Sequence, residues 1–143
     1  MQSKFTVSRA HPNGFTLLEL LVVMVIIGLL AGYVAPRYFA QVGKSEVKVT
    51  RAQIDAFEKA LEAYRLDVGK YPTTEQGLAA LMTAPPGTPN WQGPYLKKSV
   101  PLDPWKNPYH YRQPGEHGDY DIDSYGRDGK PGGQNEDADI GNW

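Results

Sequence analysis

One carboxylate, Glu19, lies near the start of an apolar segment that extends from Phe15 to Ala35. A helix of this length measures about 31 Å, because each residue adds about 1.5 Å, and it could cross a hydrocarbon core of about 30 Å. A carboxylate inside a membrane costs about 3 kcal/mol near the centre and less near an end. We therefore expect Glu19 to have a functional partner that carries a positive charge.

The residues before the apolar segment indicate where this positive charge arises. Residues 1–14 are polar, include Lys and Arg but no acid, and end in Gly14. A secretory signal is cleaved after its apolar region, whereas here a flexible glycine precedes it. Cleavage between Gly14 and Phe15 would create an α-amine four residues from Glu19. The alternative is an uncleaved single-span anchor. The basic leader predicts a cytoplasmic N-terminus, with the rest of the chain beyond the membrane.

A second group of oxygen-bearing side chains lies near the C-terminus. From Gly115 onward the chain carries eight acids, opposed only by Arg127 and Lys130. Calcium binds carboxylates, backbone carbonyls and water, so an ion that bridges Asp128 and Asp139 could close this loop. The spacing is not that of an EF-hand. On spacing alone, a solvated acidic loop is the simpler interpretation.

Hydrophobic periodicity predicts the long element that connects these two groups. We expect Pro36 to bend the first helix without ending it. Beyond it, apolar residues recur at a spacing typical of an amphipathic helix. The helix should end near Gly69, because glycine readily adopts the left-handed conformation of a helix cap. The predicted apolar face comprises Val47, Ile54, Phe57, Leu61, Tyr64 and Val68.

Turns and short elements should dominate the remainder of the chain. Residues 71–82 predict a turn and a short helix, with Thr73 as N-cap in a capping box. A proline-rich connector follows at 83–94. The alternating residues 108–112 and 120–125 predict two antiparallel strands, packed on the amphipathic helix. We expect Trp91, Trp105 and the tyrosines to form the core and its rim.

Composition argues against several classes of function. The formal net charge is −1 and the basic residues form no stripe, so we expect no nucleic-acid partner. The chain has no cysteine, so a device other than a disulfide must hold the C-terminal half together. No metal-binding histidine pair, activated nucleophile or phosphate loop is evident, and we expect no enzymatic activity.

The junction at residues 14–19 resembles the processing site of type IV pilins and their relatives, the pseudopilins. In that family a prepilin peptidase cuts after the glycine and methylates the new N-terminus. The resemblance places cleavage between Gly14 and Phe15, and methylation on Phe15. It also implies that Glu19 pairs with the N-terminal amine of a neighbouring subunit during assembly.

Further segments extend the resemblance to the major pseudopilins of type II secretion systems over nearly the whole chain. The resemblance implies an α+β, type IV pilin-like fold. A long N-terminal helix, with a membrane half and an amphipathic half, would pack on a short helix and a small antiparallel sheet with a C-terminal metal-binding loop. The segments that carry it are 71–78, 94–96, 103–109, 124–129 and 139–143.

The same resemblance implies that calcium is bound in the acidic loop. It carries the family's two ligand carboxylates over to Asp128 and Asp139. Backbone oxygens of Tyr125 and Lys130 carry over as further ligands. Some relatives have two adjacent acids where this chain has Ala138 before Asp139, and Asp137 or Glu136 would then substitute.

The predicted organisation has three parts: a leader, 1–14, removed on maturation; a transmembrane and filament-core helix, 15–35; and a periplasmic globular domain, 36–143. By resemblance, the processed inner-membrane protein forms a homopolymer, a periplasmic filament that drives folded proteins across the outer membrane. Implied partners are minor pseudopilins, the prepilin peptidase and an inner-membrane assembly platform. The alternatives are a pilin of an adhesive, motility or DNA-uptake fibre, and a membrane-tethered calcium-binding module that never polymerises.

Overall fold

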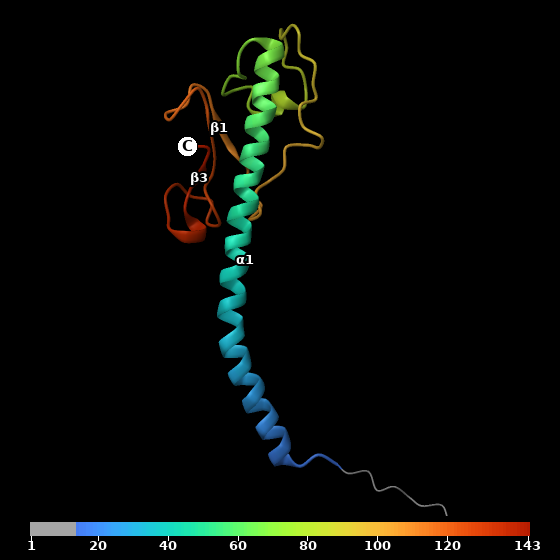
Figure 1. Cartoon of the computed structure of the whole chain (residues 1–143), viewed down its shortest axis with the longest axis vertical. Helices are drawn as coiled ribbons and strands as arrows, with labels where there is room; N and C mark the ends of the chain where they lie inside the picture. Colours follow the sequence, from blue (N-terminus) through green and yellow to red (C-terminus); the bar gives the residue numbers. More distant parts are fainter. Residues whose placement is uncertain (1–13) are drawn as a thin grey trace, which may run out of the picture. The chain divides into compact units, whose positions relative to one another are not determined.

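The computed structural model describes residues 14–143 of the chain (Figure 1). The chain divides after Phe39 into two units, and the second runs from Ala40 to Trp143. The elements are helix α1 (Leu17–Val68), the short 3-10 helices η1 (Leu78–Leu81) and η2 (Asn135–Asp137), and strands β1 (His110–Arg112), β2 (Asp121–Ser124) and β3 (Ile140–Gly141). The predicted α+β composition is confirmed.

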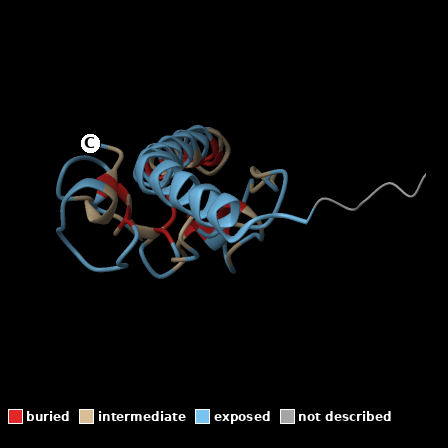
Figure 2. Cartoon of the chain, turned by 90° about the horizontal axis from the view of Figure 1, so that it is seen from below, coloured by how far each residue is buried: buried red, intermediate tan, exposed pale blue. Residues whose placement is uncertain are grey.

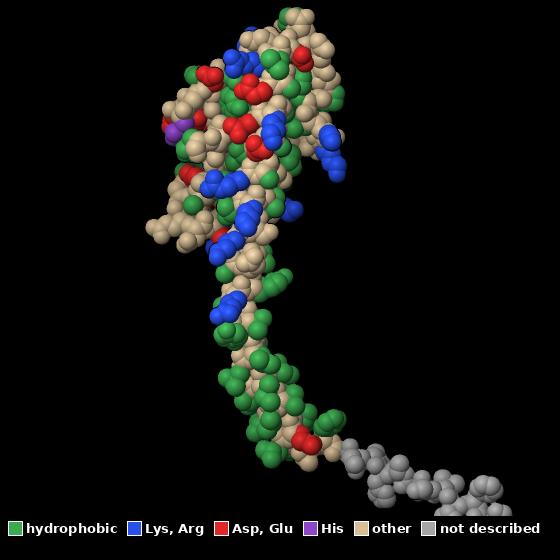
Figure 3. Space-filling view, viewed as in Figure 1, with side chains coloured by type: hydrophobic (Ala, Val, Ile, Leu, Met, Phe, Trp, Pro, Cys, Tyr) green, Lys and Arg blue, Asp and Glu red, His purple; other side chains and the backbone are tan. Residues whose placement is uncertain are grey.

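The N-terminal unit contains the apolar part of α1. From Phe15 to Val34 its large hydrophobic side chains are exposed, and they cover this part of the helix in Figure 3. Within the described residues, this helix is long and apolar enough to cross a membrane, and none of its apolar window is buried in the protein. A soluble core helix would bury such side chains, so this part of α1 requires another apolar environment. The helix continues through Pro36, as predicted.

One face of α1 forms the core of the second unit. Ile54, Phe57, Leu61 and Tyr64 are almost fully buried, and Figure 2 shows the buried residues in red. Val47 and Val68 are partly buried against the same cluster, so the predicted apolar face is confirmed. Thr50 is also fully buried, which the pattern of apolar residues did not indicate. Its hydroxyl donates to the carbonyl of Glu46 at 3.0 Å, so its polar atom is satisfied.

The end of α1 agrees with the prediction. The helix ends at Val68, and Gly69 follows with a φ of 85°. The N–H of Gly69 donates to the carbonyl of Arg65 at 2.7 Å, which satisfies one of the free carbonyls of the last turn.

The predicted N-cap of the following short helix is wrong. Thr73 and Gln76 do form the two reciprocal hydrogen bonds of a capping box, at 3.0 and 3.3 Å. They close a turn, however, because Gly77 then adopts a φ of 59° and a ψ of −166° and leaves the helical conformation. The four residues of η1 begin only after this glycine, and η1 is a 3-10 helix without a side-chain cap.

The sheet has three short antiparallel strands in the order β1-β2-β3. The first two confirm the predicted pair, although both are shorter than expected, and Tyr111 pairs with Ile122. The third strand was not predicted, because two residues show no alternation. Ile122 and Ile140 bring the sheet into the core on α1.

Trp91 and Trp105 lie at the rim of this core, as predicted. Trp91 and Trp105 are both partly buried against the hydrophobic cluster. The indole of Trp91 donates to the carbonyl of Ala80 at 2.9 Å, and that of Trp105 donates to the Glu46 carboxylate at 2.9 Å. An amphipathic ring with its N–H bonded is typical of such a position.

Burial on α1 makes a direct prediction for two leucines of the same helix. Leu61 is fully buried, so Leu61→Ala should destabilise the second unit by about 2–5 kcal/mol through lost burial and a cavity. Leu66 is 85% exposed, so Leu66→Ala should change stability by less than about 0.5 kcal/mol. Urea unfolding of both variants measures the difference, and equal effects would contradict the assigned face.

Candidate functional site

The N-terminal candidate site is the first turn of α1. The backbone N–H of Thr16 donates to Oε2 of Glu19 at 2.8 Å, and the N–H of Glu19 donates to the Thr16 hydroxyl at 3.1 Å. These two bonds form a capping box, which satisfies two of the free amides at the helix start. Interpreting Glu19 only as a charge partner missed this second role, although the Thr-x-x-Glu spacing before an apolar segment is its signature.

The predicted cleavage point lies just before this turn. No other part of the described chain lies within 4 Å of a Cβ built on Gly14, and Phe15 is 85% exposed. The peptide bond between them is therefore accessible. The rest of the predicted leader, residues 1–13, lies outside the described residues.

A buried carboxylate fixes the start of the C-terminal loop. Asp103 is 2% exposed and accepts hydrogen bonds from the amides of Trp105 and Asn107 and from the hydroxyl of Ser124, at 3.0, 2.8 and 2.6 Å. The Asn107 side chain donates to the carbonyl of Gly126 at 3.0 Å. Sequence reasoning did not identify Asp103, because nothing in its local pattern shows that it will bind the hydroxyl of Ser124 on β2.

The two predicted carboxylate ligands bind the same short segment of backbone. Asp128 Oδ1 accepts the N–H of Lys130 at 3.1 Å, and Asp139 Oδ2 accepts the N–H of Gly132 at 2.9 Å. Among the described residues, neither carboxylate forms an ion pair. Asp128 and Asp139 therefore bind the segment 130–132 from the two ends of the loop. No side chain of the described residues pairs with either carboxylate.

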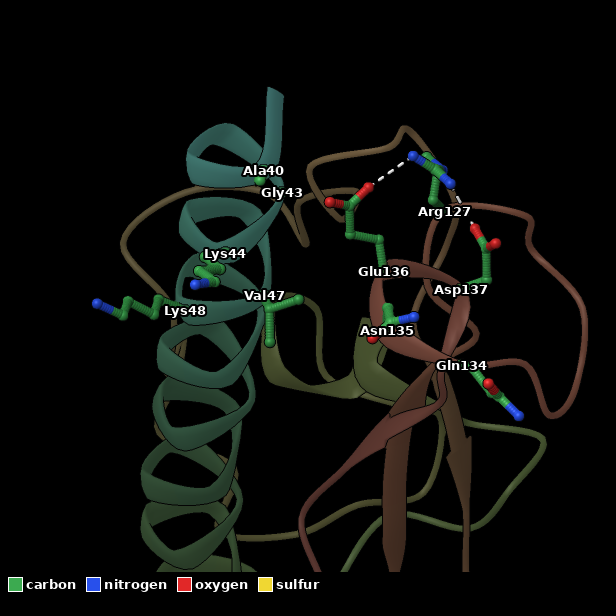
Figure 4. A pocket seen from close by; sticks show the side chains of 10 residues that line it. All are labelled: Ala40, Gly43, Lys44, Val47, Lys48, Arg127, Gln134, Asn135, Glu136 and Asp137. Atoms are coloured by element: carbon green, nitrogen blue, oxygen red, sulfur yellow. Dashed lines mark hydrogen bonds and ion pairs between the residues drawn. The ribbon is translucent and has the colours of Figure 1, made fainter. Parts of the chain in front are cut away.

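The predicted substitute ligands are engaged elsewhere. Arg127 binds both, through Nη1 to Glu136 Oε2 at 2.5 Å and through Nε to Asp137 Oδ1 at 3.1 Å (Figure 4). Asp137 could contribute to a cation site only through its other oxygen or after release from Arg127. Arg127 was counted in the sequence only as an opposing charge, and its position between the two acids depends on the fold of the loop.

Backbone carbonyls converge where the loop turns. Gly126 has a φ of 69°, and a Cβ there would lie 2.7 Å from the carbonyl oxygen of Glu136 and 2.9 Å from that of Ala138. Tyr125, whose backbone oxygen is a predicted ligand, is held by its ring, which stacks on His110 with centroids 3.9 Å apart. Glycine is required at position 126 because any side chain would collide with these carbonyls.

A further acid on β2 lies close to this loop. Burial raises the pKa of Asp123; the His110 imidazole, with its Nδ1 3.3 Å from Asp123 Oδ2, works in the opposite direction, and the negative charge of Asp139 adds to the increase. Asp123 and Asp139 are therefore close enough for their carboxylates to repel each other. Asp123 was counted among the eight acids from Gly115 onward and placed in a strand, but its half-buried position beside Asp139 was not foreseen.

The donor set fits calcium better than a transition metal. In residues 14–143, three or more Asp, Glu, His or Cys side chains nowhere come together as a metal cluster. Any ion at Asp128 and Asp139 would need backbone oxygens, such as those of Tyr125 and Lys130, and water to complete its coordination. Calcium accepts such mixed oxygen ligands, whereas zinc prefers nitrogen and sulfur ligands.

Comparison with known proteins agrees with both ends of the chain. The model of the type II secretion system protein G family matches residues 37–143, and that of the prokaryotic N-terminal methylation motif matches residues 9–35. The chain belongs to the type II secretion system protein G family. Members of this family are structural subunits, and the apolar helix indicates a membrane-anchored member.

Relatives match this family member over most of their own length. The chain is 46% identical over 138 residues to a type II secretion system core protein G of Pseudomonas aeruginosa, with 94% of this chain and 97% of the relative covered. It is 47% identical over 134 residues to one of Vibrio cholerae, with coverages of 92% and 91%.

The fold agrees with the sequence comparison. The structure matches the crystal structure of the major pseudopilin from the type 2 secretion system of enterohaemorrhagic Escherichia coli, with a TM-score of 0.61 and 38% identity. The match covers 73% of this chain and 92% of the solved one. The predicted resemblance to major pseudopilins is therefore confirmed.

Proposed function

We propose that this protein G family member is the major subunit of a periplasmic pseudopilus, a homopolymer that drives folded proteins across the outer membrane. The observation that carries the proposal is the combination of two features in one chain. The second unit has the fold and sequence of a major pseudopilin. The first unit exposes the apolar side chains of α1, and no other described part of the chain covers them.

Assembly would give this helix a second environment. The processed subunit waits in the inner membrane, where lipid covers the side chains of residues 15–35. In a filament, the same side chains would pack on neighbouring helices, and the second units would face outward. Minor pseudopilins, the prepilin peptidase and an inner-membrane assembly platform are the partners that this route requires.

Glu19 would guide each subunit into register. A carboxylate in an apolar environment is unfavourable, and the methylated amine of a neighbouring Phe15 can neutralise it. The capping box positions the carboxylate at the helix start, where such an amine would arrive. This chain's residues therefore supply both members of the ion pair.

Calcium would supply the restraint that a disulfide provides in other exported domains. Asp128 and Asp139, with backbone oxygens of Tyr125 and Lys130, would hold it, and Asp137 would join only if freed from Arg127. What supports this is the convergence of two unpaired carboxylates on residues 130–132 and the oxygen-only donor set. The ion would neutralise the repulsion among the loop acids and Asp123.

One experiment separates this function from its alternatives. The full chain is produced with its peptidase, and sheared material is examined by electron microscopy. Filaments would exclude a membrane-tethered module that never polymerises. Loss of secretion on deletion, with adhesion and transformation unaffected, would exclude an adhesive or DNA-uptake pilus.

Processing gives the first prediction of this proposal. Cleavage after Gly14 should leave mature protein that begins with Phe15 and carries one added methyl group, which mass spectrometry detects. Replacing Gly14 with a bulky residue should leave precursor in the membrane, because the accessible bond is then blocked. Mature, assembled material that still begins with Met1 would rule out the peptidase.

The role of Glu19 can be separated into charge and cap. Glu19→Leu removes both and should insert into the membrane at least as well as wild type, since the carboxylate costs up to about 3 kcal/mol there. Glu19→Gln keeps a capping-box acceptor but no charge. Both variants should lose filaments in electron microscopy and lose secretion. Normal assembly of the Gln variant would show that the cap, and not the ion pair, is what matters.

Calcium should stabilise the second unit. A fragment that starts at Arg37 contains all of the buried core, so its melting temperature can be compared in calcium and in chelator. Binding to the folded state alone would add about 2.7 kcal/mol at a hundredfold excess over the dissociation constant. Magnesium should have a much smaller effect, because it demands a tighter octahedral site.

Matched variants assign this effect to the loop. Asp128→Ala and Asp139→Ala should each remove the difference between calcium and chelator. Asp119→Ala, which removes an exposed acid before β2, should retain it. A melting curve that millimolar calcium leaves unchanged would reduce the loop to a solvated acidic segment.

A further inference from the structure

Gly43 is an unexpected residue in the middle of α1. Glycine destabilises a helix interior relative to alanine, because it loses more backbone entropy on folding. Gly43 is nevertheless buried, and it is the first buried residue along the described part of the helix. A helical glycine that is also buried indicates that another part of the chain approaches the helix backbone closely.

The group that approaches is the side chain of Glu136. A Cβ built on Gly43 would lie 2.7 Å from Glu136 Cγ and would overlap the carboxyl group beyond it. Figure 4 shows Glu136 extending from the loop toward α1 beside Gly43. Alanine at position 43 would therefore displace this side chain.

Arg127 restrains Glu136 at two points, one on its backbone and one on its carboxylate, so displacing the side chain would break the second contact. The backbone N–H of Arg127 donates to the Glu136 carbonyl at 2.9 Å, and its guanidinium binds the Glu136 carboxylate at 2.5 Å. The same guanidinium binds Asp137 at 3.1 Å. We call Arg127 together with residues 134–137 the clasp.

Residues 134–137 of the clasp lie between the two predicted calcium ligands, and Arg127 lies just outside them. Arg127 immediately precedes Asp128, and Asp137 is two residues before Asp139. An ion that joins Asp128 to Asp139 would fix both ends of the segment that contains residues 134–137, and one of those ends is next to Arg127. Once its ends are fixed, the clasp loses less conformational entropy when it docks.

We propose that the clasp is a calcium-dependent contact that docks on Gly43 and determines how much of α1 the second unit covers. The proposal rests on calcium binding by the loop. With calcium, the clasp covers α1 at Gly43, nearly two turns before the next buried residue, Thr50. A pocket of about 690 Å³ lies between the clasp and the helix residues Ala40, Lys44, Val47 and Lys48, so the docked clasp touches α1 at Gly43 and is not packed along the whole helix face. Without calcium the clasp leaves the helix.

The sign of one substitution tests the docking. In the full processed chain in detergent micelles, Gly43→Ala should lower the melting temperature in calcium. It should also accelerate hydrogen exchange of the amides of residues 126–139. An ordinary helical glycine would give the opposite result, because alanine is the better helix former. Ser45→Ala, at an exposed position two residues away, is the matched control and should leave exchange in the loop unchanged.

A double-mutant cycle assigns the clash to Glu136. In a Glu136→Ala background, Gly43→Ala should no longer lower the melting temperature, because the opposing side chain is gone. A Gly43→Ala variant that is more stable than wild type, with unchanged exchange in residues 126–139, would overturn the docking. Equal destabilisation by Gly43→Ala with and without Glu136 would also overturn it.

Calcium titration tests the coupling separately. Because linkage is reciprocal, Gly43→Ala should weaken calcium binding several-fold in isothermal titration calorimetry, and chelator should accelerate exchange in wild type as the variant does in calcium. If wild type binds no calcium, the calcium site and its coupling to the clasp are both refuted. The double-mutant cycle then still tests whether the clasp docks on Gly43. Calcium affinity that is unchanged by Gly43→Ala would refute the coupling alone.

Discussion

Burial of one face of α1 is the interaction on which the second unit depends. The sheet has only three short strands, and it reaches the core mainly through Ile122 and Ile140. Phe57, Leu61 and Tyr64 supply the largest buried side chains on the helix. The helix is therefore the scaffold, and each loop is stable to the extent that it contacts that face or is tied to a segment that does.

Polar contacts provide the ties that cysteine would otherwise supply. The buried Asp103 joins the turn at 103–107 to the end of β2. Arg127, near the start of the acidic loop, binds Glu136 and Asp137 near its end. A buried carboxylate stabilises only when its hydrogen bonds are complete, and Asp103 accepts three. Such a design tolerates little loss of a single partner, since an unsatisfied buried acid costs more than a lost contact.

Local patterns predicted the parts of this fold that depend on local physics. The apolar face of α1, its end at Gly69 and two of the strands follow from the spacing of side chains and from backbone preference. β3 was missed because two residues have no pattern, and the N-cap at Thr73 was wrong because Gly77 breaks the helix after the capping box. At the candidate site, the family resemblance singles out Asp128 and Asp139, and their role as ligands stays a prediction. The Asp103 network, the engagement of Asp137 by Arg127 and the burial of Gly43 could not, since each joins residues far apart in the sequence.

The capping box at the start of α1 also bears on how subunits meet. Among the described residues, the box engages only Oε2 of the Glu19 carboxylate, through the amide of Thr16. A carboxylate has two oxygens, so one can orient the group while the other remains an acceptor. The side-chain rotamer is thus already restricted in the isolated subunit. An incoming cation would meet a preorganised acceptor, and the entropy cost of ordering that side chain would not oppose the encounter.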